Sequence, residues 1–234
     1  MYIPFVKEVL PFLFGSLAVF GLLGLILRRL RCKRTSWVFF ALGLILAGYM
    51  LYFFRDPPRT SPADPAAIVA GADGVVMSVK EIREDTYLKT DAVRISIFLS
   101  LFDVHVNRAP IAGKIAFLGY FPGARFFTFE EKSSEFNQHN SILIEGLPAS
   151  GGALGAQGPQ TRCLVNQIVG PVARRVVYWL KLDQAVQKGD RIGMMKFGSR
   201  LDMIFPKADV DVIVKPGERV QAGVTVVATM KPKL

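Results

Sequence analysis

Two residues that could act together as a general base stand in the motif Asp103-Val104-His105. If this stretch is a strand, residues two apart point to the same side, so both side chains can face one pocket. The carboxylate could then orient the imidazole or raise its basicity, which suits proton transfer near neutral pH. A surface aspartate beside a satisfied core histidine explains the same spacing, and the motif alone leaves both interpretations open.

A second motif, Gly198-Ser199, lies between two strand-like runs at 190–197 and 201–205. Glycine supplies unusual backbone angles at a tight bend, and serine is a common turn residue. The pair alone therefore predicts a turn, and any chemical role for the serine hydroxyl has to come from the rest of the chain.

The remaining histidine and the cysteines predict little chemistry. His139 lies in a polar stretch, 135–140, where a solvated loop histidine is expected. Cys32 and Cys163 stand far apart in different surroundings, so no disulfide framework is expected. No spacing of His, Cys and carboxylates predicts a metal site.

The elements that must position these motifs follow residue 66, where short β-branched and apolar runs alternate with Gly, Pro, Asp and Asn. This pattern predicts a mostly-β barrel or sandwich. Helix is expected to be scarce in this region, and the best candidate is a short piece near 178–186. The expected strands are 68–70, 74–79, 92–98, 104–106, 113–117, 141–145, 172–177, 190–197, 201–205, 210–214 and 224–229.

A short sequence pattern that occurs twice near the C-terminus refines the predicted fold class. Residues 187–192 (QKGDRI) and 215–220 (KPGERV) each contain a Gly-acid-Arg turn that leads into a strand. Lipoyl- and biotinyl-type hybrid barrels are built from such pseudo-repeats, so we expect a β-rich hybrid barrel or sandwich of that kind. This is a prediction of fold, because one fold hosts many functions.

The first 60 residues predict a hydrophobic helical hairpin. The run 10–27 is uncharged and as a helix would reach about 27 Å, close to the thickness of a bilayer core. A second uncharged run covers 35–54 and ends in aromatics followed by Arg55, as interface anchors do. A signal peptide fits poorly, because no small-residue cleavage site follows. The proline-rich stretch 55–65 ends this region, which predicts a membrane-associated domain at 1–60 and a β-rich domain at 61–234.

The charge of +10 predicts an anionic partner. Its densest cluster, five cations within 28–34, lies between the two apolar runs, which favours an anionic membrane surface over nucleic acid. If both runs span, the positive-inside rule places this loop in the cytoplasm and the large domain outside. If the hairpin enters one leaflet and returns, the loop meets head groups on the domain's own side. Both topologies remain open.

Several blocks together resemble the short, prokaryotic class of phosphatidylserine decarboxylases, in that family's order and spacing over roughly 53–214. The matching blocks are FRDP (54–57), ADG (72–74), SLFDVHVNRAP (100–110), QIVG (167–170), ARR (173–175) and FGSRLD (197–202). Leu101 stands where the family usually has proline, and Asn-Gln-His-Asn at 137–140 replaces a usual Asn-Glu-Arg-Asn.

The resemblance implies a proenzyme that cleaves itself between Gly198 and Ser199. Ser199 would become a pyruvoyl group, and the products would be a β chain, 1–198, and an α chain, 199–234, that remain together as a heterodimer. Asp103 and His105 are implied as the pair that activates Ser199, as a serine nucleophile requires. The implied cofactor is this pyruvoyl group, with no metal.

The implied reaction is decarboxylation of phosphatidylserine to phosphatidylethanolamine and CO2, through a Schiff base between the pyruvoyl carbonyl and the substrate amine. Such a group is an electron sink that no ordinary side chain supplies. The family's link to phospholipid biosynthesis implies the cell (inner) membrane, with the catalytic domain at its cytoplasmic face. Two alternatives are a membrane-anchored hybrid-barrel adaptor without catalysis and an inactive family member. The adaptor would usually carry coiled-coil heptads, which this sequence lacks.

Overall fold

The computed structural model describes residues 5–146, 161–171, 176–196 and 199–232. The chain divides into two compact units, Met1–Pro58 and Arg59–Leu234. The first is helical and the second is built from strands. The predicted fold class, mostly β with an N-terminal helical hairpin, is confirmed.

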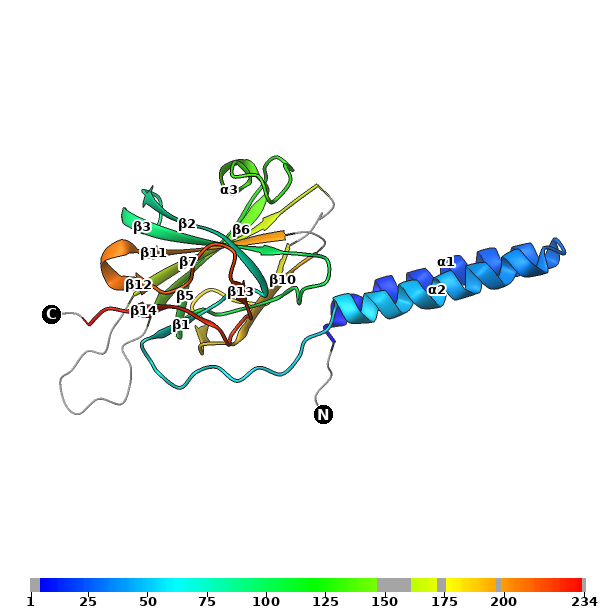
Figure 1. Cartoon of the computed structure of the whole chain (residues 1–234), viewed down its shortest axis with the longest axis horizontal. Coiled ribbons are helices and arrows are strands. Elements are labelled where there is room, and N and C mark those ends of the chain that lie inside the picture. The colour runs from blue at the N-terminus through cyan, green and yellow to red at the C-terminus, as the bar shows by residue number, and fades with distance from the viewer. Residues whose placement is uncertain (1–4, 147–160, 172–175, 197–198, 233–234) are drawn as a thin grey trace. The chain divides into compact units, whose positions relative to one another are not determined.

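The first unit is a pair of long helices that lie side by side (Figure 1). A short 3-10 turn, η1 (Lys7–Val9), leads into α1 (Leu10–Arg29), and α2 (Lys33–Phe53) follows a tight turn in which Arg31 has a positive φ of 64°. Both helices are long and apolar enough to cross a membrane, with mean hydropathies of 2.3 and 1.8. Large apolar side chains such as Leu22 and Leu44 point outward, at 60% and 68% exposure.

Small residues bring the two helices into contact. A Cβ at Gly24 would lie 2.7 Å from the Phe40 ring, and one at Gly43 would lie 2.8 Å from Phe20. The Ser36 hydroxyl donates a 2.8 Å hydrogen bond to the Gly24 carbonyl of the facing helix. Small residues at the contact and apolar ones outside are the pattern of helix pairs that pack within lipid.

The second unit contains fourteen strands, a short helix and a 3-10 turn among its described residues. In chain order the elements are β1 (Ala67–Val69), β2 (Gly74–Glu84), β3 (Thr90–Leu99), β4 (Val106–Arg108), β5 (Gly113–Phe121), α3 (Ser133–Phe136), β6 (His139–Gly146), β7 (Arg162–Val169), β8 (Val176–Tyr178), β9 (Ala185–Val186), β10 (Arg191–Met195), β11 (Ser199–Pro206), η2 (Lys207–Asp209), β12 (Val210–Val212), β13 (Arg219–Val220) and β14 (Val226–Met230).

The main sheet has eight strands in the order β13-β2-β3-β11-β7-β6-β5-β9 and curls into a half-barrel (Figure 1). Two smaller sheets, β1-β14-β12 and β4-β10-β8, complete the unit. All pairings between these strands are antiparallel. β11 is central: it pairs along its whole length with β3 and over Ser199–Ile204 with β7.

The two faces of β11 differ because side chains alternate along a strand. Leu201, Met203 and Phe205 enter the main apolar core with residues of the small sheets. Ile204 belongs to a second apolar cluster with Leu88 and Leu164 on the other face. Ser199 shares the parity of the first set, so it points to the main-core face.

The two similar segments, 187–192 and 215–220, form two turns of the same kind. Gly189 and Gly217 have positive φ values of 85° and 93°, which glycine adopts without steric cost. In each turn the acidic residue that follows, Asp190 or Glu218, accepts a hydrogen bond from the main-chain N–H three residues earlier, at 2.7 and 3.2 Å. The repeated sequence thus encodes a repeated turn.

Two sequence-based expectations for local structure are wrong. The expected helix near 178–186 is absent: β8 and β9 flank a turn in which Asp183 has a φ of 64°. The expected strand at 104–106 begins only at Val106, because Asp103 lies in a turn closed by its N–H to the Ser100 carbonyl (3.1 Å). Residues 172–175 of another expected strand lie outside the described residues.

Candidate functional site

Ser199 is the first residue of β11, and its side chain is completely buried. Its main chain lies opposite Leu99 of β3 and Val169 of β7. The Ser199 Oγ has no hydrogen-bond partner among the described residues. A buried hydroxyl without a partner costs about 1–3 kcal/mol, so its presence points to a use other than stability. Gly198, the other half of the predicted cleavage pair, lies outside the described residues.

His105 lies beside the same segment of chain and is also completely buried. Its carbonyl accepts a hydrogen bond from the N–H of Met195 (3.3 Å), the last residue of β10. The Cα atoms of Met195 and Ser199, four residues apart, lie within roughly 14 Å of each other. Because Leu99 lies opposite Ser199, the loop from Leu99 to His105 begins beside Ser199 and ends beside Met195.

The contact that Asp103 makes with His105 differs from the one the sequence predicted. The His105 Nδ1 lies 3.0 Å from the main-chain carbonyl of Asp103. The Asp103 carboxylate instead accepts hydrogen bonds from the N–H and hydroxyl of Ser100 (2.8 and 2.7 Å) and from Arg219 (3.2 Å). The strand alternation behind the prediction does not apply, because Asp103 lies in the turn. Asp103 therefore holds the imidazole through its main chain.

A second carboxyl, Asp73, lies at this end of the sheet and was quoted from the sequence only as a family block. Burial raises the pKa of the Asp73 carboxyl, against the lowering effect of the Ala222 N–H (2.8 Å) and of Arg59 (2.9 Å), and the charge of Asp103 raises it further. Burial also opposes the charged form of Asp103, but hydrogen bonds from Ser100 and Arg219 outweigh it and lower its pKa. Two neighbouring carboxyls with pKa values shifted apart suit acid and base roles.

A buried amide pair faces the same interior. Gln167 of β7, two residues before the partner of Ser199, donates a 2.7 Å hydrogen bond from its Nε2 to the Asn107 Oδ1. Both side chains are fully buried, and the Asn107 Nδ2 has no partner among the described residues. The pair thus fixes the amide of Asn107 and leaves a donor available. No sequence pattern singled it out, because the pairing joins residues 60 apart.

The opposite face of β11 carries an ion-pair network. The Asp202 carboxylate accepts hydrogen bonds from Arg200 Nε (2.7 Å) and from the Ser134 hydroxyl (2.6 Å), and it lies 3.8 Å from Arg94 Nε. Arg200 also donates to the Ser96 hydroxyl (2.7 Å). Arg200 and Asp202 are at most 1% exposed, so this network is part of the buried framework.

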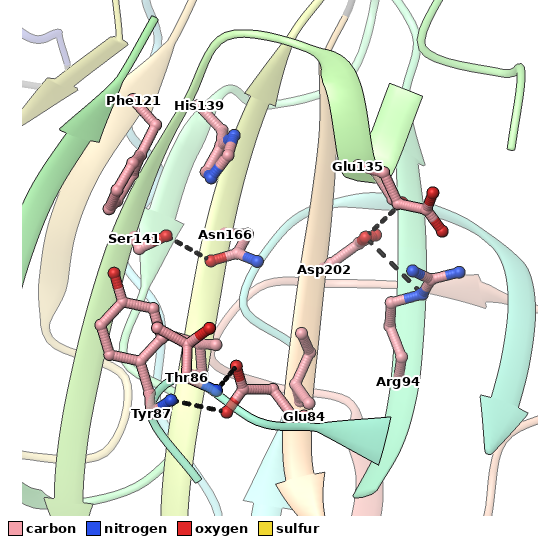
Figure 2. A pocket seen from close by; sticks show the side chains of 13 residues that line it. Glu84, Thr86, Tyr87, Arg94, Phe121, Glu135, His139, Ser141, Asn166 and Asp202 are labelled. Atoms are coloured by element: carbon pink, nitrogen blue, oxygen red, sulfur yellow. Dashed lines mark hydrogen bonds and ion pairs between the residues drawn. The ribbon is translucent and has the colours of Figure 1, made fainter. Parts of the chain in front are cut away.

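A pocket of about 400 Å³ opens on this second face (Figure 2), and Ser199 is not among the residues that line it. Its walls include Tyr87, Phe121, His139, Asn166 and Asp202. His139 was expected to be a solvated loop residue, but it begins β6, is partly buried and stacks on Phe121 with ring centroids 5.1 Å apart. Figure 2 shows Ser141 bonded to Asn166 and Arg94 directed at Asp202, so the pocket floor is internally paired.

Across the described residues, no group of three or more His, Cys, Asp or Glu side chains is placed to hold a metal ion. Cys32 is exposed and Cys163 is buried, both as free thiols. Burial raises the pKa of the Cys163 thiol well above its usual value, so it is a poor nucleophile.

Comparison with known proteins identifies the family. Residues 46–228 match the family model described as phosphatidylserine decarboxylase. The chain is 43% identical over 195 residues to a phosphatidylserine decarboxylase proenzyme of Carboxydothermus hydrogenoformans, which covers 82% of this chain and 86% of that protein. A protein of the same description from Pelobacter propionicus is 38% identical and is covered over 97% of both chains. With this match over most of its length, and with the family blocks at 72–74 and 100–110 gathered around Ser199, the chain belongs to the phosphatidylserine decarboxylase family.

Proposed function

We propose that this protein is a self-processing decarboxylase that converts phosphatidylserine to phosphatidylethanolamine and CO2. The observation that carries the proposal is the buried Ser199 hydroxyl, which has no partner among the described residues and lies beside the loop that ends in His105. Family membership supports the substrate, and the word proenzyme in the names of the relatives supports maturation by cleavage.

Maturation begins with the Ser199 Oγ attacking the carbonyl carbon of residue 198. His105 accepts the hydroxyl proton and returns it to the Ser199 nitrogen as the peptide bond breaks, which leaves an ester. Loss of the Ser199 Cα proton then expels residue 198 as a carboxylate, and the chain is cut. Hydrolysis of the resulting dehydroalanine releases ammonia and leaves a pyruvoyl group on residue 199. The absence of a Cβ at Gly198 gives the hydroxyl steric access to its carbonyl.

The two products stay together because they share sheets. β11 belongs to the small chain, and both of its neighbours, β3 and β7, belong to the large one. β14 of the small chain pairs with β1 of the large chain. A heterodimer of the chains 1–198 and 199–234 follows, held by main-chain hydrogen bonds on both sides of β11.

The pyruvoyl group would supply the electron sink that decarboxylation of an amino acid requires. The chain's own residues then bind and orient the substrate. The free Nδ2 of Asn107, held by Gln167, would donate to an anionic oxygen of the bound head group. Asp73, whose pKa is raised by burial, is suited to hold a proton near that site.

The helical unit supports a lipid substrate. Its two helices have the length and apolar surface for a bilayer, and the cations of 28–34 suit anionic head groups. We place the protein at the inner membrane with its second unit on the cytoplasmic side, where phospholipid biosynthesis would supply the substrate.

The test is to incubate the full chain with phosphatidylserine labelled in the head-group carboxyl carbon. The proposal expects labelled CO2 and phosphatidylethanolamine in equal amounts, and inhibition by hydroxylamine, which captures keto groups. Release of no CO2 by correctly cleaved protein would overturn the activity. Undiminished activity in hydroxylamine would overturn the pyruvoyl assignment.

A further inference from the structure

Two loops at the Ser199 end of the main sheet present large apolar side chains to solvent. The first carries Leu101 and Phe102, at 45% and 67% exposure. The second runs from β5 to β6 and carries Phe127, Phe129 and Phe136, at 55%, 61% and 58%. We propose that these five side chains, the apolar rim, insert into the bilayer surface and hold the catalytic unit against the lipid that contains its substrate. The proposal rests on the proposed function and adds a membrane contact separate from α1 and α2.

The strand register places both loops at the same end of the sheet as Ser199. Leu99 lies opposite Ser199, so the chain from Ser100 onward leaves the sheet there. On the other side, β5 ends and β6 begins at the pair Phe121 and His139, and His139 pairs with Ile168, the partner of Arg200. Figure 1 shows α3 and its loop standing out beyond this end of β6.

The second loop is fastened to the neighbour of Ser199. The Asn137 side chain accepts a hydrogen bond from the Phe126 N–H (2.9 Å) and donates to the carbonyls of Phe126 and Val169 (2.7 and 2.9 Å). Val169 pairs directly with Ser199. Asn137 is 1% exposed, so a buried side chain fixes the loop that carries the exposed aromatic residues.

The exposed aromatic side chains of the second loop stack on each other and are carried by a fixed turn. Phe127 and Phe129 stack with ring centroids 5.3 Å apart and an interplanar angle of 15°. The buried Thr128 between them accepts a hydrogen bond at its carbonyl from the Ser133 hydroxyl (3.2 Å). Such an exposed aromatic pair on a fixed turn marks an interaction surface.

The chemistry around the rim favours lipid as the occupant. Three of the four acidic side chains beside it are paired with cations: Glu130 with Lys132 (2.8 Å), Glu131 with Lys80 (3.1 Å), and Asp103 with Arg219 (3.2 Å). The fourth, Glu135, is exposed and makes no ion pair among the described residues. Residues 59–234 carry 22 Lys and Arg against 17 Asp and Glu, so the unit is attracted to anionic head groups. A diacyl substrate must also bring its head group to Ser199 while its acyl chains stay in hydrocarbon, which requires an apolar surface at this end.

The first experiment measures local depth in the full chain, reconstituted into phosphatidylcholine–phosphatidylglycerol vesicles. Phe129→Cys and Leu182→Cys are made in a Cys32→Ser background and labelled with an environment-sensitive fluorophore. Leu182 is a matched control, because it is 58% exposed and precedes Asp183, whose N–H binds Ile115 near the opposite end of β5. We expect lipids spin-labelled near the head group to quench position 129 and not 182. Equal quenching at both positions, or a signal at 129 that follows protein density and so reports a second copy, would overturn the proposal.

The second experiment separates docking from chemistry. We expect the double variant Phe127→Ser, Phe129→Ser to lose about tenfold in rate on phosphatidylserine in vesicles, since full burial of one phenylalanine exceeds that effect. Its rate on a monomeric short-chain phosphatidylserine should equal that of the wild type, and Leu182→Ser should match the wild type on both substrates. Equal loss on both substrates, or no loss on vesicles, would overturn the docking surface. A wild type inactive on both substrates would instead overturn the proposed function.

Discussion

The two faces of β11 are buried to the same degree but treat their polar groups in opposite ways. On one face the Ser199 hydroxyl has no partner among the described residues, and the nearby Asn107 Nδ2 has none either. On the other face Asp202 is surrounded by Arg200, Ser134 and Arg94. Two nitrogens on this face, Arg200 Nη1 and Arg94 Nε, make no hydrogen bond, yet both guanidinium charges are paired with carboxylates.

The difference assigns separate roles to the two faces of β11: the Ser199 face suits the proposed reaction, and the Asp202 face fixes the position of the strand. Satisfied buried charges are costly to break and make the framework rigid. Unsatisfied buried groups lower stability, so their presence beside the predicted scissile bond indicates a function. In the proposed function, β11 keeps Ser199 in register because the alternate residues Arg200 and Asp202 are held by ion pairs and hydrogen bonds.

The largest expected effect comes from removing the reactive hydroxyl. Ser199→Ala should remain one chain of about 25.8 kDa and release no CO2, because it lacks the hydroxyl that the proposed cleavage requires. Ser141→Ala, on the pocket face and bonded to Asn166, is the matched control and should be cut normally. A denaturing gel reads both, and a cut Ser199→Ala protein would remove the assignment.

The two histidines give the next contrast. His105→Ala should slow self-cleavage by at least about a hundredfold, the range of a general base, and the rate is read as loss of uncut chain with time. His139→Ala should mature at the wild-type rate, because His139 faces the pocket on the other side. Equal rates in the two variants would mean that His105 is a core residue only.

Breaking the framework face should change stability and leave the reaction path intact. Asp202→Asn removes the carboxylate that pairs with the buried Arg200, while Arg94 keeps its ion pair with Glu131. The substitution should lower the free energy of unfolding by about 3 kcal/mol. Asp211→Asn, whose carboxylate is 69% exposed and pairs with Lys231, should change it little. Chemical denaturation measures both. Similar values for the two variants would contradict a structural role for the Asp202 network.

Gln167 and Asn166 are neighbours in β7 that lie on opposite faces of the sheet, so substituting each tests the comparison of the two faces. Gln167→Ala frees the Asn107 amide on the reactive face and should lower turnover about tenfold, the size of one buried hydrogen bond to a charged group, in protein that is already cut. Asn166→Ala, one residue earlier on the pocket face, should keep wild-type turnover. Loss of turnover in both would point to general disruption of β7.

The smallest effect concerns pH. The folded pKa of Asp103 is lowered, so its contribution to stability is present above the unfolded pKa and is lost as pH falls through the folded one. Arg219→Gln removes one of the lowering contributions, so the loss of stability on acidification should be slightly smaller and should be complete at slightly higher pH. The shift is small because Arg219 is 71% exposed. Denaturant midpoints measured from neutral to acid pH test this, and a shift to lower pH would contradict it.

Sequence patterns predicted most of the strands because each shows local alternation or a turn signal, as at Gly189 and Gly217. They missed β7, whose run from Arg162 to Val169 is buried on both faces and mixes Asn and Gln with apolar residues. They also misplaced Asp103, since the turn at Ser100 depends on hydrogen bonds to the carboxylate and not on periodicity.

The sequence predicted only those site residues that lie in short contiguous motifs. The resemblance carried by FGSRLD and DVHVN named Ser199 and His105; in the structure Ser199 lies opposite Leu99, and His105 binds the N–H of Met195. The Asn107–Gln167 pair and the support of Asn137 under the apolar rim join distant residues, and a single sequence holds no trace of such contacts.

The most direct measurement is the intact mass of the purified wild-type protein under denaturing conditions. Self-cleavage at Gly198–Ser199 predicts two chains, the smaller spanning 199–234, lacking a free amino terminus and lighter than its encoded sequence by one ammonia. A single chain of about 25.8 kDa, or a fragment that begins with an intact serine, would contradict it.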